Sequence, residues 1–217
     1  MTGRVGFIAI EGPIGAGKTS LAKTLAQRLN ARLELEDIES NPFLKDFYRD
    51  PGRFAFKTQI FFLLSRYQRQ RELLQGDLFK KGLISDYLFA KDRIFAEINL
   101  DDRELALYDR IYEVLNPTVA KPDLAIYLRA ETEALISRVR GRGLDFERGI
   151  TGDYLERVNQ AYGRFFSQYN ETPLLVVDSD KADFIGNRQE LERLVEEIDK
   201  VKEGTHHYMP LGSKSLD

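Results

Sequence analysis

The segment from Gly12 to Thr19 has the residue types and spacing of a loop that holds the phosphates of a nucleotide. It reads Gly-x-x-x-x-Gly-Lys-Thr, and it lies between an apolar run and an amphipathic one. Glycines let backbone N–H groups turn toward an anion, and the start of a following helix adds positive potential. In this pattern Lys18 contacts the β- and γ-phosphates, and the Thr19 hydroxyl joins the shell of a Mg²⁺ ion. We therefore expect ATP to bind to Gly12, Pro13, Ile14, Gly15, Ala16, Gly17, Lys18, Thr19 and Ser20.

Two acidic residues stand at the ends of other apolar runs. Asp86 ends one run and Glu36 ends another. Ligands of a parallel sheet gather at the carboxyl ends of its strands, so both carboxylates are expected near the phosphate loop. We expect Asp86 to hold Mg²⁺ together with Thr19, although a helix cap is its alternative role. We expect Glu36 to be the general base that accepts a proton from an attacking hydroxyl. The same acidic run contains two rival acids, Asp37 and Glu39.

Residues 138–148 contain four arginines in a chain that is acidic overall. They are Arg138, Arg140, Arg142 and Arg148. Phosphoryl transfer builds up negative charge between donor and acceptor, and an arginine-rich flap stabilises that charge and excludes water. We expect a lid near residues 138–150, with Arg138 and Arg142 binding ATP and acting in catalysis beside Lys18. A solvated basic helix end, favoured by the helix dipole, is the alternative interpretation.

Strand and helix patterns alternate along the chain. Strands are predicted at 5–11, 32–36, 82–86, 123–128 and 174–178, and helices at 19–29, 53–74, 104–115, 132–140, 154–169 and 187–201. Such alternation is typical of a parallel sheet with helices on both faces. We therefore expect an α/β fold of three layers, the P-loop kinase fold, with a five-stranded parallel sheet. Residues 1–203 are expected to form a single domain, and residues 204–217 a loose polar tail.

Composition excludes several functional classes. The 217 residues carry a net charge of −3, and a protein that binds nucleic acid or an anionic membrane normally has a basic excess. There is no cysteine, which excludes disulfides and thiolate metal sites. No apolar run reaches the ~20 residues of a membrane helix. We expect a cytoplasmic protein with a small-molecule partner, binding neither nucleic acid nor membrane.

Three classes of nucleotide-binding protein remain: switch GTPases, mechanical ATPases and small-molecule kinases. A GTPase carries Asn-Lys-x-Asp to read guanine, and the nearest text, Asp180-Lys181-Ala182-Asp183, lacks the asparagine. Mechanical ATPases are usually larger. A small-molecule kinase explains more of the acids and arginines described above.

Further blocks of the chain carry a family resemblance. These blocks are Glu36 followed by Asn41-Pro42-Phe43-Leu44, Tyr48 eleven residues before Gln59, the run Gln59-Ile-Phe-Phe-Leu-Leu-Ser65-Arg66, and Lys91-Asp92-Arg93-Ile94-Phe95-Ala96. Together with the phosphate loop and the arginines they resemble the deoxyribonucleoside kinase family, over about residues 5–183. Its members act on deoxyadenosine, deoxyguanosine and deoxycytidine.

The resemblance implies roles for individual residues. Glu36 would deprotonate the sugar 5'-hydroxyl, while Tyr48 and Glu147 would hold the sugar. Gln59, Arg66 and Asp92 would lie beside the base. Gln59 also interrupts an otherwise apolar helical stripe, and a buried amide needs a partner such as a base edge. Three aromatic residues are candidates for the pocket wall, with core packing as their alternative role: Phe56, Phe62 and Phe95.

The chain departs from the family pattern at one position. Related kinases have an acid followed by arginine at the end of the third strand, and here Asp86 is followed by Tyr87. Three arginines are candidates to replace the missing one: Arg93, Arg140 and Arg148.

These observations predict an ATP-dependent kinase that phosphorylates the 5'-hydroxyl of deoxyadenosine or deoxyguanosine in nucleotide salvage. The resemblance also implies a homodimer formed by long helices such as 53–74. One alternative is a nucleoside monophosphate kinase such as thymidylate kinase, with Arg49, Arg53 and Lys57 binding the acceptor phosphate. The other is a nucleotide-binding regulatory protein without an acceptor.

Overall fold

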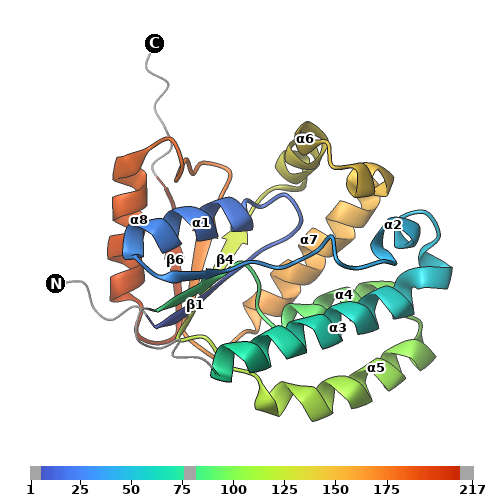
Figure 1. Ribbon diagram of the computed structural model, residues 1–217. Helices are drawn as coiled ribbons and strands as arrows, with labels where there is room; N and C mark the ends of the chain where they lie inside the picture. Colours follow the sequence, from blue (N-terminus) through green and yellow to red (C-terminus); the bar gives the residue numbers. More distant parts are fainter. Residues whose placement is uncertain (1–5, 76–81, 211–217) are drawn as a thin grey trace.

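A six-stranded parallel sheet forms the centre of the molecule (Figure 1), which is a computed structural model describing residues 6–75 and 82–210. The strands lie in the order β2-β3-β1-β4-β5-β6, and every neighbouring pair is parallel. Their bounds are β1 Phe7–Glu11, β2 Arg32–Glu34, β3 Leu83–Ser85, β4 Leu124–Arg129, β5 Leu174–Asp178 and β6 Thr205–Tyr208. The carboxyl ends of all six strands therefore lie at one edge of the sheet.

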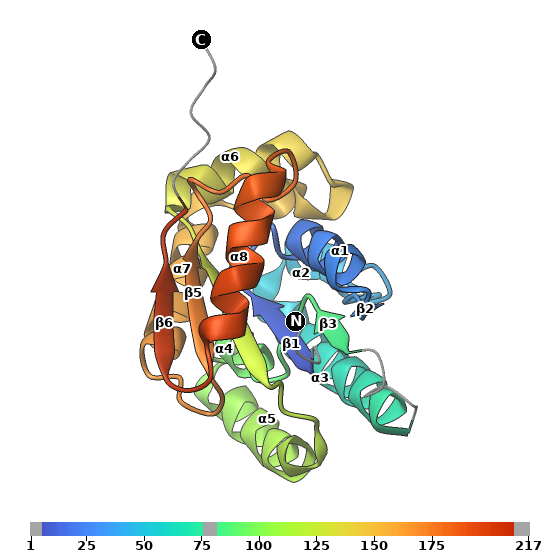
Figure 2. The ribbon, with the colours of Figure 1, turned by 90° about the vertical axis from the view of Figure 1, so that its left-hand side faces the viewer.

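Helices cover both faces of this sheet (Figure 2). Their bounds are α1 Lys18–Leu29, α2 Leu44–Phe47, α3 Pro51–Gln75, α4 Lys91–Asn99, α5 Asp102–Leu115, α6 Thr132–Arg142, α7 Gly152–Ser167 and α8 Arg188–Lys200, with short 3₁₀ helices η2 Asn116–Thr118 and η3 Asp145–Gly149. Helices α1 and α8 pack on one face, while α4 and α7 pack on the other. Helices α3 and α5 pack outside α4.

The strand sequences explain why both faces are covered. Ile8 and Ile10 of β1 pack toward α1 and α8, whereas Phe7 and Ala9 pack toward α4 and α7. Successive side chains of a strand point to opposite faces, so a strand that is apolar at every position is stable only when both faces are buried. This three-layer α/β arrangement confirms the predicted fold class.

Local signals place the helix starts well. Asp101 and Glu104 form a capping box at the start of α5. Asn187 caps α8 by accepting from the backbone of Gln189 and Glu190, whereas the Glu190 carboxylate accepts from the backbone of Asp183.

The structure corrects three predictions about elements. The sheet has six strands rather than five, because Thr205–Tyr208, expected in the loose tail, pairs with β5 as β6. Strand β2 ends at Glu34, so Glu36 lies in the following loop. Helix α4 was not predicted as an element. Val5 and residues 211–217 lie outside the described residues. Among the helices of residues 6–75 and 82–210, none combines the length and the hydrophobicity that a membrane span requires.

Candidate active site

The phosphate loop connects β1 to α1. Gly17, at the start of α1, has a φ of 94°, a left-handed conformation that glycine adopts readily. No described side chain caps α1, so the N–H groups of its first turn are available to an anion. Lys18 Nζ donates to the carbonyls of Gly12 and Pro13, at 2.7 and 3.0 Å. Burial lowers the pKa of Lys18 to about 8, although the Glu11 carboxylate opposes the effect. The loop therefore has the geometry and charge to hold a triphosphate.

Thr19 and Asp86 meet at the carboxyl edge of the sheet. The Thr19 hydroxyl donates to Asp86 Oδ2 at 2.5 Å, and the Glu36 backbone N–H donates to Asp86 Oδ1 at 2.8 Å. The described residues contain no group of three or more metal-binding side chains. Mg²⁺ in a kinase needs only one or two protein ligands, because phosphates and water supply the others. This hydroxyl–carboxylate pair therefore fits the predicted Mg²⁺ site.

Glu36 is held by two cations from two different helices. Arg66 of α3 donates through Nε to Oε1 at 2.6 Å, and Lys91 of α4 donates to Oε2 at 2.5 Å. The Glu36 side chain is only 8 % exposed. Burial alone would raise its pKa, but the two cations outweigh burial and lower it to about 2. The carboxylate is thus ionised at neutral pH, and both of its oxygens are occupied.

A cavity of about 960 Å³, counting the part that opens to solvent, extends from the phosphate loop past Glu36. Gln59 of α3 lines it, and the Gln59 Oε1 atom is buried without a hydrogen-bond partner among the described residues. Phe62 and Phe95 also line the cavity. A flat apolar wall with one amide in need of a partner fits a nucleobase. Phe56 instead packs among α3, α4 and α5.

Asp92 is fully buried and pairs with the guanidinium of Arg66. Burial raises the pKa of Asp92, and Arg66 counteracts this effect. Arg66 itself lines the cavity, whereas Asp92 lies behind it. The structure therefore brings the predicted pair together, with Arg66 joining Asp92 to Glu36.

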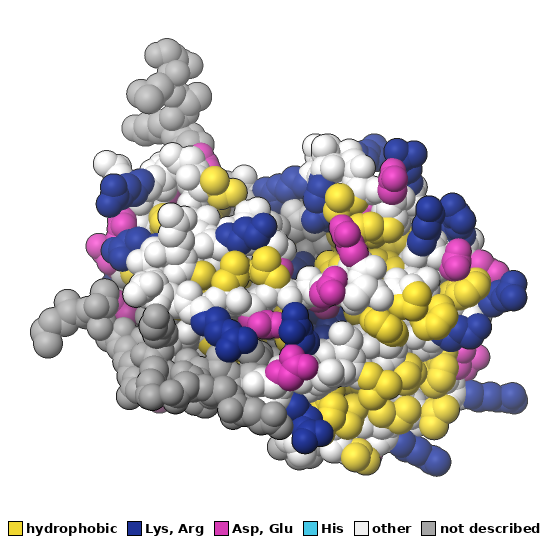
Figure 3. Space-filling view, viewed as in Figure 1, with side chains coloured by type: hydrophobic (Ala, Val, Ile, Leu, Met, Phe, Trp, Pro, Cys, Tyr) yellow, Lys and Arg dark blue, Asp and Glu magenta, His cyan; other side chains and the backbone are white. Residues whose placement is uncertain are grey.

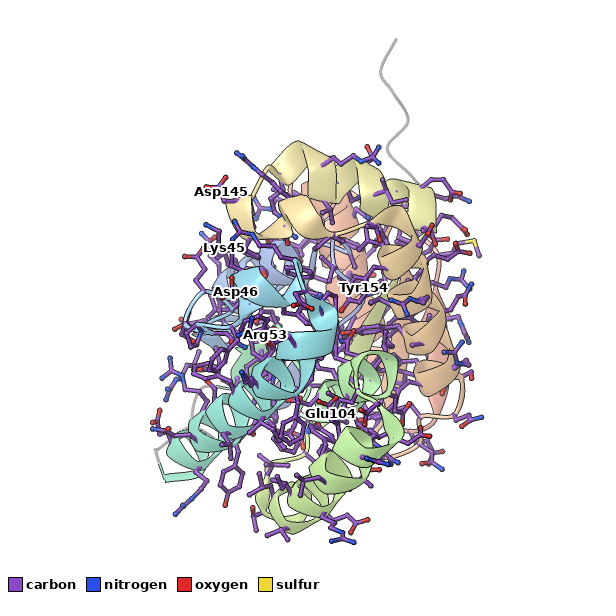
Figure 4. All side chains as sticks on the ribbon, turned by 90° about the vertical axis from the view of Figure 1, so that its right-hand side faces the viewer. Lys45, Asp46, Arg53, Glu104, Asp145 and Tyr154 are labelled. Atoms are coloured by element: carbon purple, nitrogen blue, oxygen red, sulfur yellow. The ribbon has the colours of Figure 1, made fainter. Side chains whose placement is uncertain are left out.

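The two predicted sugar ligands come from different parts of the chain, because Tyr48 follows α2 and Glu147 lies in η3. Tyr48 and Glu147 both line the cavity, and Arg142 donates to Glu147. Burial raises the pKa of Glu147, while Arg142 opposes that shift. Tyr154 of α7 lies beside α2 (Figure 4), with its ring centroid 6.2 Å from that of Tyr48. Gly149 approaches Tyr48 so closely that a Cβ at this position would lie 2.9 Å from the Tyr48 carbonyl oxygen.

The structure separates the two lid arginines that the sequence grouped together. Arg142 lines the cavity with Lys18. Arg138 points to the other side of the phosphate loop, where it donates to the Ser179 carbonyl at 2.9 Å and lies 3.2 Å from Asp180. There it lines a second hollow with Gly17 and residues 182–185. In this conformation Arg138 is placed to contact a nucleotide from outside the transfer site.

Related kinases carry an arginine at the position of Tyr87, and three arginines were predicted to replace it. None of the three lines the cavity. Arg93 pairs with Glu97 and Asp109 at the surface, Arg148 is 79 % exposed beside Asp145, and Arg140 is exposed. The prediction was wrong because these arginines are close to the site in the sequence, whereas their side chains are exposed at the surface.

Two buried charged residues of the site were missed. Glu11, the last residue of β1, accepts from the backbone of Gly12 and Leu88 and from the Tyr162 hydroxyl. An acid that ends an apolar strand was the signal used for Asp86, and it applies equally to Glu11. Lys91 is also buried, with 3% of its surface exposed, yet the residues around it in the sequence do not indicate burial.

The comparisons with known proteins agree with this geometry. Residues 8–203 match the family model described as deoxynucleoside kinase. The chain belongs to the deoxynucleoside kinase family. It is therefore a nucleoside kinase, an enzyme that transfers a phosphoryl group, and the family implies ATP as the donor. This finding rules out the regulatory alternative.

Named relatives of this deoxynucleoside kinase cover nearly its whole length. A deoxyguanosine kinase of Bacillus subtilis is 38% identical over 201 residues, covering 90% of this chain and 97% of the relative. A deoxyadenosine/deoxycytidine kinase of the same organism is 30% identical, with 90% and 92% covered. The structure of a deoxyadenosine kinase from M. mycoides with bound dATP has a TM-score of 0.78 and 28% identity, covering 89% of this chain and 99% of that one.

The monophosphate kinase alternative loses its structural basis. It required basic residues facing the acceptor, but Arg49 is 68% exposed beside Asp46. Arg53 and Lys57 are exposed and lie over the ring of Phe54. None of these three cations lines the cavity.

Proposed function

We propose that this kinase transfers the γ-phosphate of ATP to the 5'-hydroxyl of a purine deoxynucleoside, deoxyadenosine or deoxyguanosine, in nucleotide salvage. One observation carries the proposal: the amide oxygen of Gln59, which has no partner in the part of the chain that the structure describes, is buried in the same cavity that Lys18 and Glu36 line. A cavity that is lined by the phosphate loop and also by an amide able to read a base matches the chemistry of a nucleoside beside its phosphate donor. Residues 1–203 would act as one domain, with a lid near residues 138–150.

Each residue has a role that follows from its environment. Lys18 and Arg142 carry positive charge into the cavity and stabilise the transferring phosphoryl group. Glu36 accepts the proton of the 5'-hydroxyl, because its carboxylate is ionised and each oxygen keeps a lone pair beside the cation that it binds. Thr19 and Asp86 would hold Mg²⁺, which neutralises phosphate charge when bound. Tyr48 and Glu147 would orient the sugar, so that its 5'-oxygen faces the donor. Arg138 contributes to nucleotide binding.

The base preference rests on Gln59, on Arg66 with its partner Asp92, and on the relatives. The Gln59 amide offers both donors and an acceptor, and Arg66, held by the buried Asp92, lines the same cavity, which suits a purine. Deoxyguanosine is the first choice, because the relative with 38% identity is named deoxyguanosine kinase. Deoxyadenosine is the second, because other relatives carry that name.

We also propose that the enzyme is a cytoplasmic homodimer. Helix α5 buries only one residue fully, Tyr108, while Leu107 and Val114 on α5 and Leu64 on α3 are strongly exposed. Apolar side chains gather over α3 and α5 on the face in Figure 3. Contiguous exposed apolar surface of this kind is typical of protein interfaces.

A phosphate-transfer panel tests the proposal. The purified enzyme is incubated with ATP and Mg²⁺ and with each of the four deoxynucleosides or their 5'-monophosphates, and ADP release is followed. We expect turnover with deoxyguanosine or deoxyadenosine and none with any monophosphate. Turnover with a monophosphate but with no nucleoside would contradict the proposal.

A further inference from the structure

The sequence leaves open which cation replaces the arginine that related kinases carry after the strand-end acid. Tyr87 occupies that position and is buried, and its hydroxyl has no hydrogen-bond partner among the described residues. The Tyr87 side chain does not line the cavity. The position after Asp86 is therefore occupied by a phenol ring, which brings no charge to the reacting groups.

Lys91 lies where such a cation is needed. It belongs to the first turn of α4, five residues after Asp86, and its side chain reaches back into the cavity lining. Its ammonium group donates to Glu36 Oε2 at 2.5 Å and lies 3.8 Å from Glu11 Oε1. A lysine is rarely buried unless it is paired, and here both neighbours are carboxylates.

We propose that Lys91 is a positioning residue for Glu36, and that it takes over from a different helix the role of the missing arginine. This inference rests on the proposed function of Glu36 as proton acceptor. Arg66 fixes one carboxylate oxygen and Lys91 fixes the other, so the two cations together determine where the carboxylate plane points. A shift of about 1 Å at a catalytic group costs on the order of 100-fold in rate.

The two cations are not equivalent. Arg66 is held by a second, fully buried carboxylate, Asp92, whereas the second partner of Lys91 is more distant. Lysine also has a flexible stem with freely rotating donors, while the arginine fork is rigid. Arg66 is therefore the more firmly held of the two cations, and the loss of Lys91 leaves the carboxylate plane free to turn about the Arg66 contact, which affects turnover more than substrate binding. The other ionisable groups around this pair are Glu11, Lys18, Tyr48, Asp86, Tyr87, Asp92 and Tyr162.

Steady-state kinetics with ATP and deoxyguanosine test this role in Lys91→Met, Lys91→Arg and the matched control Arg93→Met. Arg93 lies on the same helix, but it pairs at the surface. We expect Lys91→Met to lower kcat at least ~100-fold, with both KM values changed less than about threefold. Lys91→Arg should recover at least tenfold of that loss, and Arg93→Met should stay within twofold of wild type. Calorimetric titration with ATP should give the same Kd for wild type and Lys91→Met.

Three results would overturn the inference: a kcat of Lys91→Met within threefold of wild type, a loss that appears only in KM, or no recovery by arginine. Thermal unfolding of each variant shows whether a loss of kcat is due to misfolding. If Lys91→Met is misfolded, the kcat of Lys91→Arg, which keeps the charge, decides whether Lys91 positions Glu36. Wild-type activity is measured first. A wild type inactive on every nucleoside contradicts the proposed function, whereas an active wild type with an unaffected Lys91→Met contradicts the role of Lys91 alone.

Discussion

Replacing Glu36 by glutamine removes the proposed proton acceptor while keeping the shape of the side chain. A general base contributes ~10²–10⁴-fold to the rate. We therefore expect Glu36→Gln to lower kcat by at least 100-fold and to leave the Kd for ATP within about threefold. Lys18 and the phosphate loop, which would hold ATP, keep their own contacts with Gly12 and Pro13.

The same substitution has a stability effect whose size follows from the ion pairs. Arg66 and Lys91 lower the pKa of Glu36 from 4.5 to about 2. Each pKa unit corresponds to ~1.4 kcal/mol, so the charged carboxylate stabilises the fold by up to about 3 kcal/mol. Because the folded pKa is the lower one, this contribution is present above pH 4.5 and is lost as the pH falls toward 2. Glu36→Gln should thus lower the free energy of unfolding at pH 7 by ~1–3 kcal/mol, and the difference from wild type should shrink below pH 4.5.

The assay combines steady-state kinetics, calorimetric titration with ATP, and urea unfolding at several pH values. Glu39→Gln is the matched control, because Glu39 is an exposed acid in the same run. It should change none of these quantities. A Glu36→Gln enzyme with kcat within threefold of wild type would refute the assignment of the base. A control that loses activity as severely would show that the acidic run acts as a whole.

Three further predictions concern the phosphate loop, the lid and the surface. Lys18→Met should abolish turnover. Burial lowers the pKa of Lys18 from 10.5 to about 8, so the stability of the wild type should rise between pH 8 and 10.5, and thermal unfolding of Lys18→Met should lack this rise. Gly149→Ala would place a Cβ 2.9 Å from the Tyr48 carbonyl oxygen and should raise KM for the nucleoside at least tenfold. The control Gly163→Ala, in open space on α7, should leave KM unchanged, and equal KM values for the two variants would refute the close lid contact. Val114→Asp should convert a dimer to a monomer in light scattering, since Val114 is 73% exposed; an unchanged mass would exclude α5 from the interface.

The parts of the site that the sequence predicts depend on local signals. The glycine loop, the acid at the end of β3 and the cap of α5 each follow from a few neighbouring residues. Asp86 meets Thr19 because parallel strands end at one edge of the sheet, which the alternation of elements already implies. Such features need no knowledge of how distant segments pack.

The parts that the sequence does not predict depend on tertiary placement. Lys91 reaches Glu36 only because α4 packs across the sheet beside α3. Strand β6 pairs through its backbone while its histidines stay exposed, so its sequence lacks the apolar alternation that reveals a strand. Arg138 and Arg142 are equivalent in the sequence, but they leave α6 on different sides and enter different hollows.

Phosphorus NMR of the reaction products tests the central claim most directly. The wild-type enzyme is incubated with ATP, Mg²⁺ and deoxyguanosine, and in parallel with the analogue that lacks the 5'-hydroxyl. The account predicts deoxyguanosine 5'-monophosphate and ADP from the nucleoside, and no new phosphate ester from the analogue. A phosphate ester on the analogue, or ADP released without any nucleotide product, would contradict it.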